Sequence, residues 1–244
     1  MAGAAFVLSQ VLRAAHRSDL PSFPNQDPTG TFGDPDAPPL RIVALGDSSI
    51  TAPGVSRLDN VWIRRVALGL AIRYRVELIA LAVGGSKAHD VIEGQLDEAV
   101  RLRPDIGVVS VGSNDSLRGV RRANFEHRLH HILSRLEEVA DAVVVLGMGD
   151  LGSIPRLPPA IRPYVSRRGR VFDGLCSRVA AAHPKAVKVY TKGRMSSAFW
   201  EDRSLFAPDQ FHAGDGGHAV FAKEAMPAFL AAVAMVEAAR TARV

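Results

Sequence analysis

The residues of this 244-residue chain that are most able to do chemistry lie in short polar turns and in one loop. Ser48 stands in the turn "GDSS", directly after an apolar stretch. A serine at such a position either caps a helix with its hydroxyl group or, when a base removes its proton, acts as a nucleophile. The second role requires a histidine, a carboxylate that orients the histidine, and donors that stabilise a negatively charged oxygen.

His212 is the best candidate for the base among the eight histidines. It lies three residues after Asp209 in the loop "APDQFHAGDGG", so the carboxylate can accept a hydrogen bond from the imidazole ring. That bond fixes the tautomer and leaves the other ring nitrogen available to take a proton from Ser48. We interpret His218 as a residue in the first turn of the last helix, with Asp215 as the N-cap.

Two further polar turns, "GGSK" and "GSND", follow apolar stretches in the same way. Gly85 in the first turn has no Cβ, so its backbone N–H can approach a substrate closely. Asn114 in the second turn carries a side-chain amide that can donate to an oxyanion. The ordinary alternatives are a tight turn at Gly85 and an Asx-turn at Asn114. We interpret Asp47 and Asp115 as braces that accept backbone N–H bonds.

Short Val- and Ile-rich stretches alternate with amphipathic helical patterns from residue 40 onward. Such stretches are typical of strands that are covered on both faces of a parallel sheet. The carboxyl ends of parallel strands meet at one edge of the sheet, so we expect the three polar turns to lie together there. The expected strands span about 41–45, 76–83, 105–111, 142–147 and 186–190, and the expected helices about 60–74, 88–101, 122–140, 166–182 and 215–241, the last with a kink at Pro227.

The polar blocks, taken in order, resemble the SGNH hydrolases, which are also called GDSL-type esterases and lipases. The blocks are Gly46-Asp47-Ser48, Gly85, Gly112-Ser113-Asn114-Asp115 and Asp209-Gln210-Phe211-His212. The resemblance covers about residues 41–222 and implies a flavodoxin-like three-layer α/β/α sandwich, here with a five-stranded parallel sheet. It also implies that Ser48 is the nucleophile and that His212 is the base, oriented by Asp209. Ser48, Gly85 and Asn114 are then the oxyanion-hole donors.

Two positions depart from the family pattern. Ser49 stands where the fuller signature has leucine, and Gly84 takes the place of the polar residue that often precedes the second-block glycine. Neither change removes a catalytic group. The second change does remove an expected brace for the Gly85 loop.

Length and composition favour one domain over residues 40–244, since 47% of the residues are hydrophobic and α/β domains of this size are common. Residues 1–39 are predicted to form an apolar segment followed by a Pro-rich linker or wrapping arm. The apolar segment is too short to span a bilayer and lacks the basic start of a signal peptide. We expect it to dock on the domain or on a membrane surface, or to be the remnant of a longer anchor, and the protein to be cytoplasmic or membrane-associated.

Composition also bears on partners and cofactors. The net charge is +5, but no nucleic-acid motif is present and aromatic residues make up only 6%, so no nucleic-acid partner is predicted. Cys176 is the single cysteine, which excludes an internal disulfide and a thiolate metal cluster. The turn "GGSK" lacks the spacing of a phosphate-binding loop. We therefore expect no metal and no cofactor, and a small-molecule ester as the partner.

The function predicted from these residues is that of a serine esterase acting through an acyl-enzyme on Ser48. The alternatives are an acyltransferase or thioesterase on the same triad, or a binding protein of this fold without turnover. We predict short acyl groups, acetyl to about hexanoyl, because the segments expected to wall the site offer no long apolar groove. Those segments are 147–164, with Leu151, Ile154 and Leu157, and 196–206, with Phe199, Trp200 and Phe206.

Overall fold

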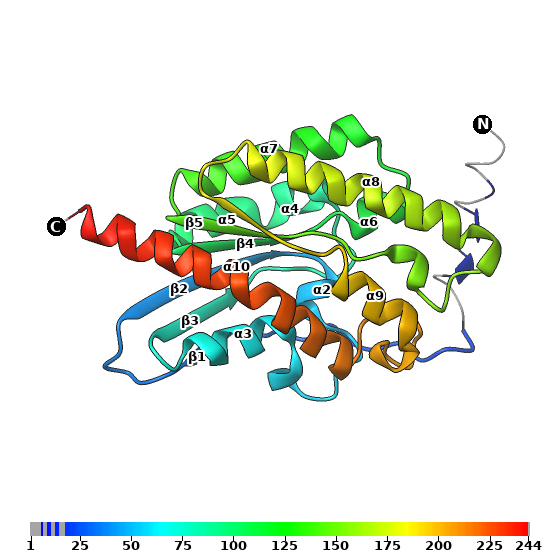
Figure 1. Ribbon diagram of the computed structural model, residues 1–244, viewed down its shortest axis with the longest axis horizontal. Helices are drawn as coiled ribbons and strands as arrows, with labels where there is room; N and C mark the ends of the chain where they lie inside the picture. Colours follow the sequence, from blue (N-terminus) through cyan, green and yellow to red (C-terminus); the bar gives the residue numbers. More distant parts are fainter. Residues whose placement is uncertain (1–5, 7–8, 11–12, 15–17, 244) are drawn as a thin grey trace.

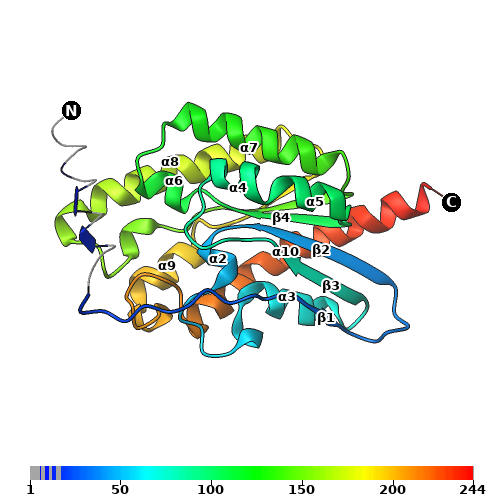
Figure 2. The same cartoon turned by 180° about the vertical axis from the view of Figure 1, so that it is seen from behind.

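The computed structural model describes residues 6, 9–10, 13–14 and 18–243. Most of the apolar segment at the start of the chain, and with it the predicted membrane contact, therefore lies outside the described residues. Residues 18–39 are described, and they run along the domain close to the sheet and its loops (Figure 2).

A six-stranded sheet in the order β1-β3-β2-β4-β5-β6 forms the middle layer (Figure 1). The five predicted parallel strands are confirmed as β2 (Pro39–Gly46), β3 (Arg75–Ala80), β4 (Ile106–Ser110), β5 (Ala142–Leu146) and β6 (Ala186–Val189). The predicted strand count was wrong, because β1 (Gly30–Phe32) adds an antiparallel edge strand on β3. Its three residues carry no repeating apolar pattern, and glycine is uncommon in strands, so no local pattern predicts a strand there.

Helices cover both faces of the sheet and complete the predicted three-layer sandwich (Figures 1 and 2). Strand β2 explains the two layers, since Val43 and Leu45 pack with one apolar cluster while Ile42 and Ala44 pack with the other. Alternate side chains of a strand point to opposite faces, so a strand covered twice must be apolar throughout. The first cluster contains α4 (Ala88–Gly94), α5 (Leu96–Leu102), α7 (Arg122–Glu137) and α8 (Arg162–Ala181), and the second contains α3 (Trp62–Leu70) and α10 (Asp215–Thr241).

The single helix predicted over 88–101 is two helices, α4 and α5, which are separated at Gln95. The Gln95 side chain forms two hydrogen bonds with the backbone at the end of β2. Its Oε1 accepts a hydrogen bond from Gly46 N (2.8 Å), and its Nε2 donates to Gly46 O (3.0 Å). The helix break therefore secures the backbone directly before Ser48.

Helix α10 runs from Asp215 to Thr241 as one helix and contains Pro227. Among the described helices it alone has the length and the mean hydropathy, 1.6 over an 18-residue window, that a membrane span requires. It packs against α3, β5 and β6, and its Phe229 is fully buried. A helix in the core of a domain meets the same two criteria.

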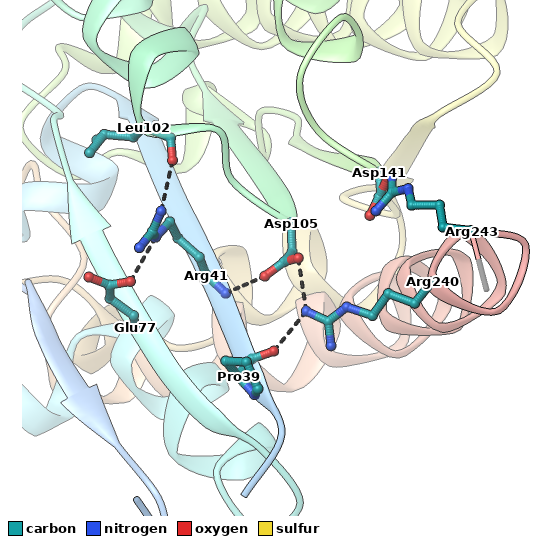
Figure 3. A network of polar contacts seen from close by, with 8 residues as sticks. All are labelled: Pro39, Arg41, Glu77, Leu102, Asp105, Asp141, Arg240 and Arg243. Carbon is teal, nitrogen blue, oxygen red and sulfur yellow. Dashed lines mark hydrogen bonds and ion pairs between the residues drawn. The ribbon is translucent and has the colours of Figure 1, made fainter.

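A polar network at the amino ends of the strands fixes the far end of α10 (Figure 3). Arg240 Nη2 donates to Asp105 Oδ1 (2.9 Å) and to Pro39 O (2.7 Å). Asp105 Oδ2 in turn accepts from Arg41 N (2.7 Å), and the Arg41 guanidinium pairs with Glu77. This network lies at the edge of the sheet opposite the Ser48 turn.

Candidate active site

The turn that contains Ser48 follows β2, and helix α2 (Ser48–Thr51) begins in it. Asp47 caps this helix, since its Oδ1 accepts a hydrogen bond from Ser49 N (2.9 Å). A β-carbon at Gly46, where φ is +152°, would lie 2.1 Å from Ser110 O, so only glycine fits there. The Ser48 hydroxyl has no hydrogen-bond partner among the residues that the structure describes. Capping therefore does not account for Ser48.

Two buried aspartates brace the turns, as the sequence predicts. Burial raises the pKa of Asp47, although hydrogen bonds from Ser49 and Asn114 oppose this shift. Burial likewise raises the pKa of Asp115 to about 6, and its Oδ2 accepts from Ala88 N (3.0 Å) at the start of α4. Each carboxylate thus ties the end of one strand to the backbone or side chain of a neighbouring turn.

Asp209 and His212 form a hydrogen-bonded pair in the loop before α10. Asp209 Oδ2 lies 2.6 Å from His212 Nδ1, and Oδ1 accepts from Phe211 N (2.9 Å) and His212 N (3.0 Å). Burial alone would raise the pKa of Asp209, but these hydrogen bonds outweigh it and hold the pKa below the usual value. The carboxylate therefore stays charged and directs Nδ1, which leaves Nε2 for other partners.

The three predicted donors lie at the same edge of the sheet. In the described part of the chain, the backbone N–H groups of Ser48 and Gly85 make no hydrogen bond, and Gly85 has a φ of +82° that favours glycine. The Asn114 amide donates to Asp47 Oδ2 (3.1 Å) and to Ser86 O (3.2 Å). Asn114 thus links the first and second turns, and the ordinary Asx-turn interpretation does not describe it.

Two cavities meet at this edge, and both are lined by Ser48, Asn114 and His212. The apolar cavity extends beneath the segments that were expected to wall the site, and its apolar lining includes Leu146, Met148, Leu151, Ile154, Met195, Phe199, Phe206, Phe211 and Phe221. Two of the expected wall residues do not line it. Trp200 is 47% exposed, and Leu157 is buried.

The second cavity, called the arm-side cavity below, also borders Ser48 and is partly formed by residues 18–25 of the N-terminal arm. Its wall combines apolar side chains such as Leu20 and Phe23 with polar ones that include Ser18, Ser22, Asn25, Arg118, Arg156 and Asp209. The arm is held here by Asn25, whose Oδ1 accepts from Thr51 Oγ1 (2.6 Å), and by Gln26, whose N donates to Thr51 O (2.7 Å).

Asn25 and Gln95 are the supporting residues that sequence reasoning missed. A β-carbon at Gly84 would lie 2.2 Å from Asn25 Oδ1, so the arm takes the space that a polar brace at position 84 would need. Neither residue lies in a family motif, and each meets its partner across a long separation in sequence. The one available signal was Gly84 itself, because a glycine beside a turn allows close approach of another segment.

His218 lies in the first turn of α10, as predicted, but Asp215 is not its N-cap. Gly214 occupies that position, while Asp215 is the first helical residue and accepts a hydrogen bond from Ser56 N (2.9 Å). His218 is buried, and its Nδ1 accepts from Trp62 N (3.2 Å). Burial lowers the pKa of His218 to about 3, so this ring is neutral near pH 7. Among the described residues, no cluster of three or more His, Cys, Asp or Glu is arranged to hold a metal ion.

A mostly parallel α/β sheet with a serine, an asparagine and an Asp–His pair at its carboxyl edge is typical of serine hydrolases of the SGNH class. The chain belongs to the GDSL-like lipase/acylhydrolase family, whose profile matches residues 44–220. The resemblance drawn from the sequence is thereby confirmed. The GDSL-like esterase Rv1075c of Mycobacterium tuberculosis is 31% identical over 155 residues. These residues are 61% of this chain and 46% of that protein, so the chain spans about half the length of this relative.

Solved structures share the fold. LAE5, an alpha/beta hydrolase enzyme from the metagenome of Lake Arreo, superposes with a TM-score of 0.63 at 22% identity, covering 82% of this chain and 97% of that one. TesA gives a TM-score of 0.63 at 20% identity, with coverages of 79% and 99%. A catalytic mutant of Axe2, an acetylxylan esterase from Geobacillus stearothermophilus, gives 0.63 at 15% identity, with coverages of 79% and 94%.

Proposed function

We propose that this chain is a serine esterase that hydrolyses short-chain carboxylic esters through an acyl-enzyme on Ser48. The observation that carries the proposal is the Asp209–His212 pair, at 2.6 Å, whose histidine lines the same two cavities as Ser48. Ser48 is the nucleophile, His212 is the base, and Asp209 orients the ring. The donors for the oxyanion are the backbone N–H groups of Ser48 and Gly85 and the Asn114 amide, which must release Asp47 Oδ2 or Ser86 O in order to donate to it.

The reaction begins when Ser48 Oγ attacks the ester carbonyl and His212 Nε2 takes the hydroxyl proton. The carbonyl oxygen gains a negative charge, which preorganised N–H donors stabilise. His212 then gives its proton to the departing alcohol, and an acyl-serine ester remains. Water attacks that ester with His212 again as base, which releases the acid and restores Ser48. The hydroxyl and Nε2 are not hydrogen-bonded in the free protein, and such contacts often tighten only when substrate binds.

Family membership supports this assignment. The matching catalytic mutants of Axe2 replace one serine, one aspartate and one histidine, and in that protein the aspartate precedes the histidine by three positions. Asp209 and His212 have the same spacing.

The preference for short acyl groups rests on the apolar cavity. Phenylalanine and methionine side chains wall it, among them Phe199, Phe206 and Met195. Phe199 packs edge-on against Phe206, with 5.1 Å between ring centroids, and stacks on Phe221 at 5.2 Å. Each methylene contributes about 0.8 kcal/mol only when it is buried, so affinity stops rising once the chain is longer than the walled space.

The experiment is a measurement of kcat/KM for p-nitrophenyl esters of increasing acyl length, below their micelle-forming concentrations. We expect the highest value between acetyl and hexanoyl and a steep fall beyond. A maximum at ten carbons or more would overturn the short-chain proposal. Product analysis with an added alcohol completes the test, because predominant transfer to that alcohol over water would favour the acyltransferase alternative.

A further inference from the structure

The two cavities that meet at Ser48 differ in chemistry. Both have apolar side chains in their walls, but Arg118 and Arg156 line the arm-side cavity, while none of the described arginines lines the apolar cavity. An ester bound with its carbonyl carbon at Ser48 must place its acyl group on one side and its alcohol on the other. The apolar cavity, whose described walls contain no arginine, suits the acyl group, so the arm-side cavity receives the alcohol.

Arg118 is a charged residue of the arm-side cavity that lies beside two of the proposed oxyanion donors. It follows directly after α6 (Ser113–Leu117), the short helix that carries Asn114, and its backbone N donates to Asn114 O (2.9 Å). Its Nη2 would lie 3.4 Å from a β-carbon built on Gly85. The backbone of Arg118 is thus held to the turn of Asn114, and its guanidinium lies beside the turn of Gly85.

The Arg118 guanidinium makes no hydrogen bond or ion pair with another residue in the described part of the chain, and the residue is exposed. Arg156, on the same cavity wall, donates from Nε to Ala14 O. The carboxylate that lines this cavity, Asp209, is already engaged by His212 and by two backbone N–H groups. The cavity therefore presents positive charge and planar N–H donors that suit a carboxylate or phosphate oxygen.

We infer that the preferred substrates carry an anionic group, a carboxylate or a phosphate, on the alcohol side of the ester, and that Arg118 binds this group. The inference rests on the proposed esterase function and adds the substrate class. Arg118 therefore determines which esters are preferred, because a neutral ester with the same acyl group offers no charged group for the guanidinium to bind.

The test compares two acetyl esters that differ in one charge, 4-acetoxybenzoate and its neutral methyl ester. We measure kcat/KM for both with the wild type, Arg118→Ala, Arg118→Lys and the matched control Arg121→Ala, which changes an exposed arginine that does not line the cavity. We expect Arg118→Ala to lower the anionic-to-neutral ratio about five- to tenfold and Arg118→Lys to restore part of it. The effect should shrink at 1 M salt because the site is exposed. Arg121→Ala should leave the ratio unchanged.

Two results would overturn the inference while leaving the esterase function standing. One is an unchanged ratio in Arg118→Ala, and the other is an equal loss of activity toward both esters, which would mean that Arg118 supports the loop or the oxyanion site. Hydrolysis of the neutral ester by the wild type shows independently that the esterase function holds. If the wild type hydrolyses neither ester, the proposed esterase function itself is overturned.

Discussion

His218 gives a prediction with a magnitude that follows from its burial. Its pKa falls from 6.5 to about 3 because the ring is fully buried, and its Nδ1 accepts a hydrogen bond from Trp62 N. In the unfolded chain the ring becomes protonated below pH 6.5, whereas in the folded chain it stays neutral until about pH 3. The unfolded state therefore binds more protons in this window, and the stability that His218 contributes is lost as the pH falls.

Each pKa unit is worth about 1.4 kcal/mol, so between pH 7 and pH 4 this one group should remove about 3 kcal/mol from the free energy of unfolding. His218→Gln keeps an acceptor for Trp62 N but does not titrate. We expect the difference in unfolding free energy between wild type and variant to shift by that amount, in favour of the variant, as the pH is lowered.

The assay is urea unfolding of both proteins at pH 7, 6, 5 and 4. Other acidic groups titrate in both proteins and cancel in the difference. A difference that is constant across this range would refute a neutral buried His218. The result also bears on the mechanism, because a ring that stays neutral down to about pH 3 cannot cause a change of activity near neutral pH.

Three substitutions test the supports of the site. Asp209→Asn keeps an oxygen for the loop N–H groups but loses the charge that directs His212, so kcat should fall about 1,000- to 10,000-fold, and a loss below tenfold would contradict the orienting role. Asn114→Ala should lower kcat about 100- to 1,000-fold, whereas a rise in KM alone would assign Asn114 to substrate binding. Gly84→Ala forces Asn25, and with it the arm, away from the Gly84 turn and should cost about 1–3 kcal/mol in urea unfolding. The control Gly94→Ala, whose added β-carbon meets no atom within 4 Å, should be nearly neutral, and equal stability of the two variants would argue against the contact.

The parallel strands and the ordered polar turns could be predicted because their signals are local. Each strand is apolar throughout since it is covered twice, and Ser48 and Asn114 follow such strands directly. The pairing of Asp209 with His212 was equally accessible, because both residues lie in one loop.

What escaped prediction depends on contacts between distant segments. Gln95 lies in a helical pattern that gives no reason for a break, and its partner Gly46 is 49 residues away. The edge strand β1 is held in the sheet by backbone pairing with β3. Its three side chains form no pattern from which a strand could be predicted. Asn25 contacts the Gly84 turn from an arm whose composition indicates only extended chain.

The central claim, that Ser48 is the nucleophile, is tested most directly by identifying the residue that reacts with a fluorophosphonate probe. The wild-type protein and Ser48→Ala are treated with the probe, digested, and analysed by peptide mass spectrometry. The account predicts one adduct, on Ser48, and no adduct in Ser48→Ala that remains folded. An adduct on a neighbouring serine such as Ser49, or ester hydrolysis by Ser48→Ala at the wild-type rate, would contradict it.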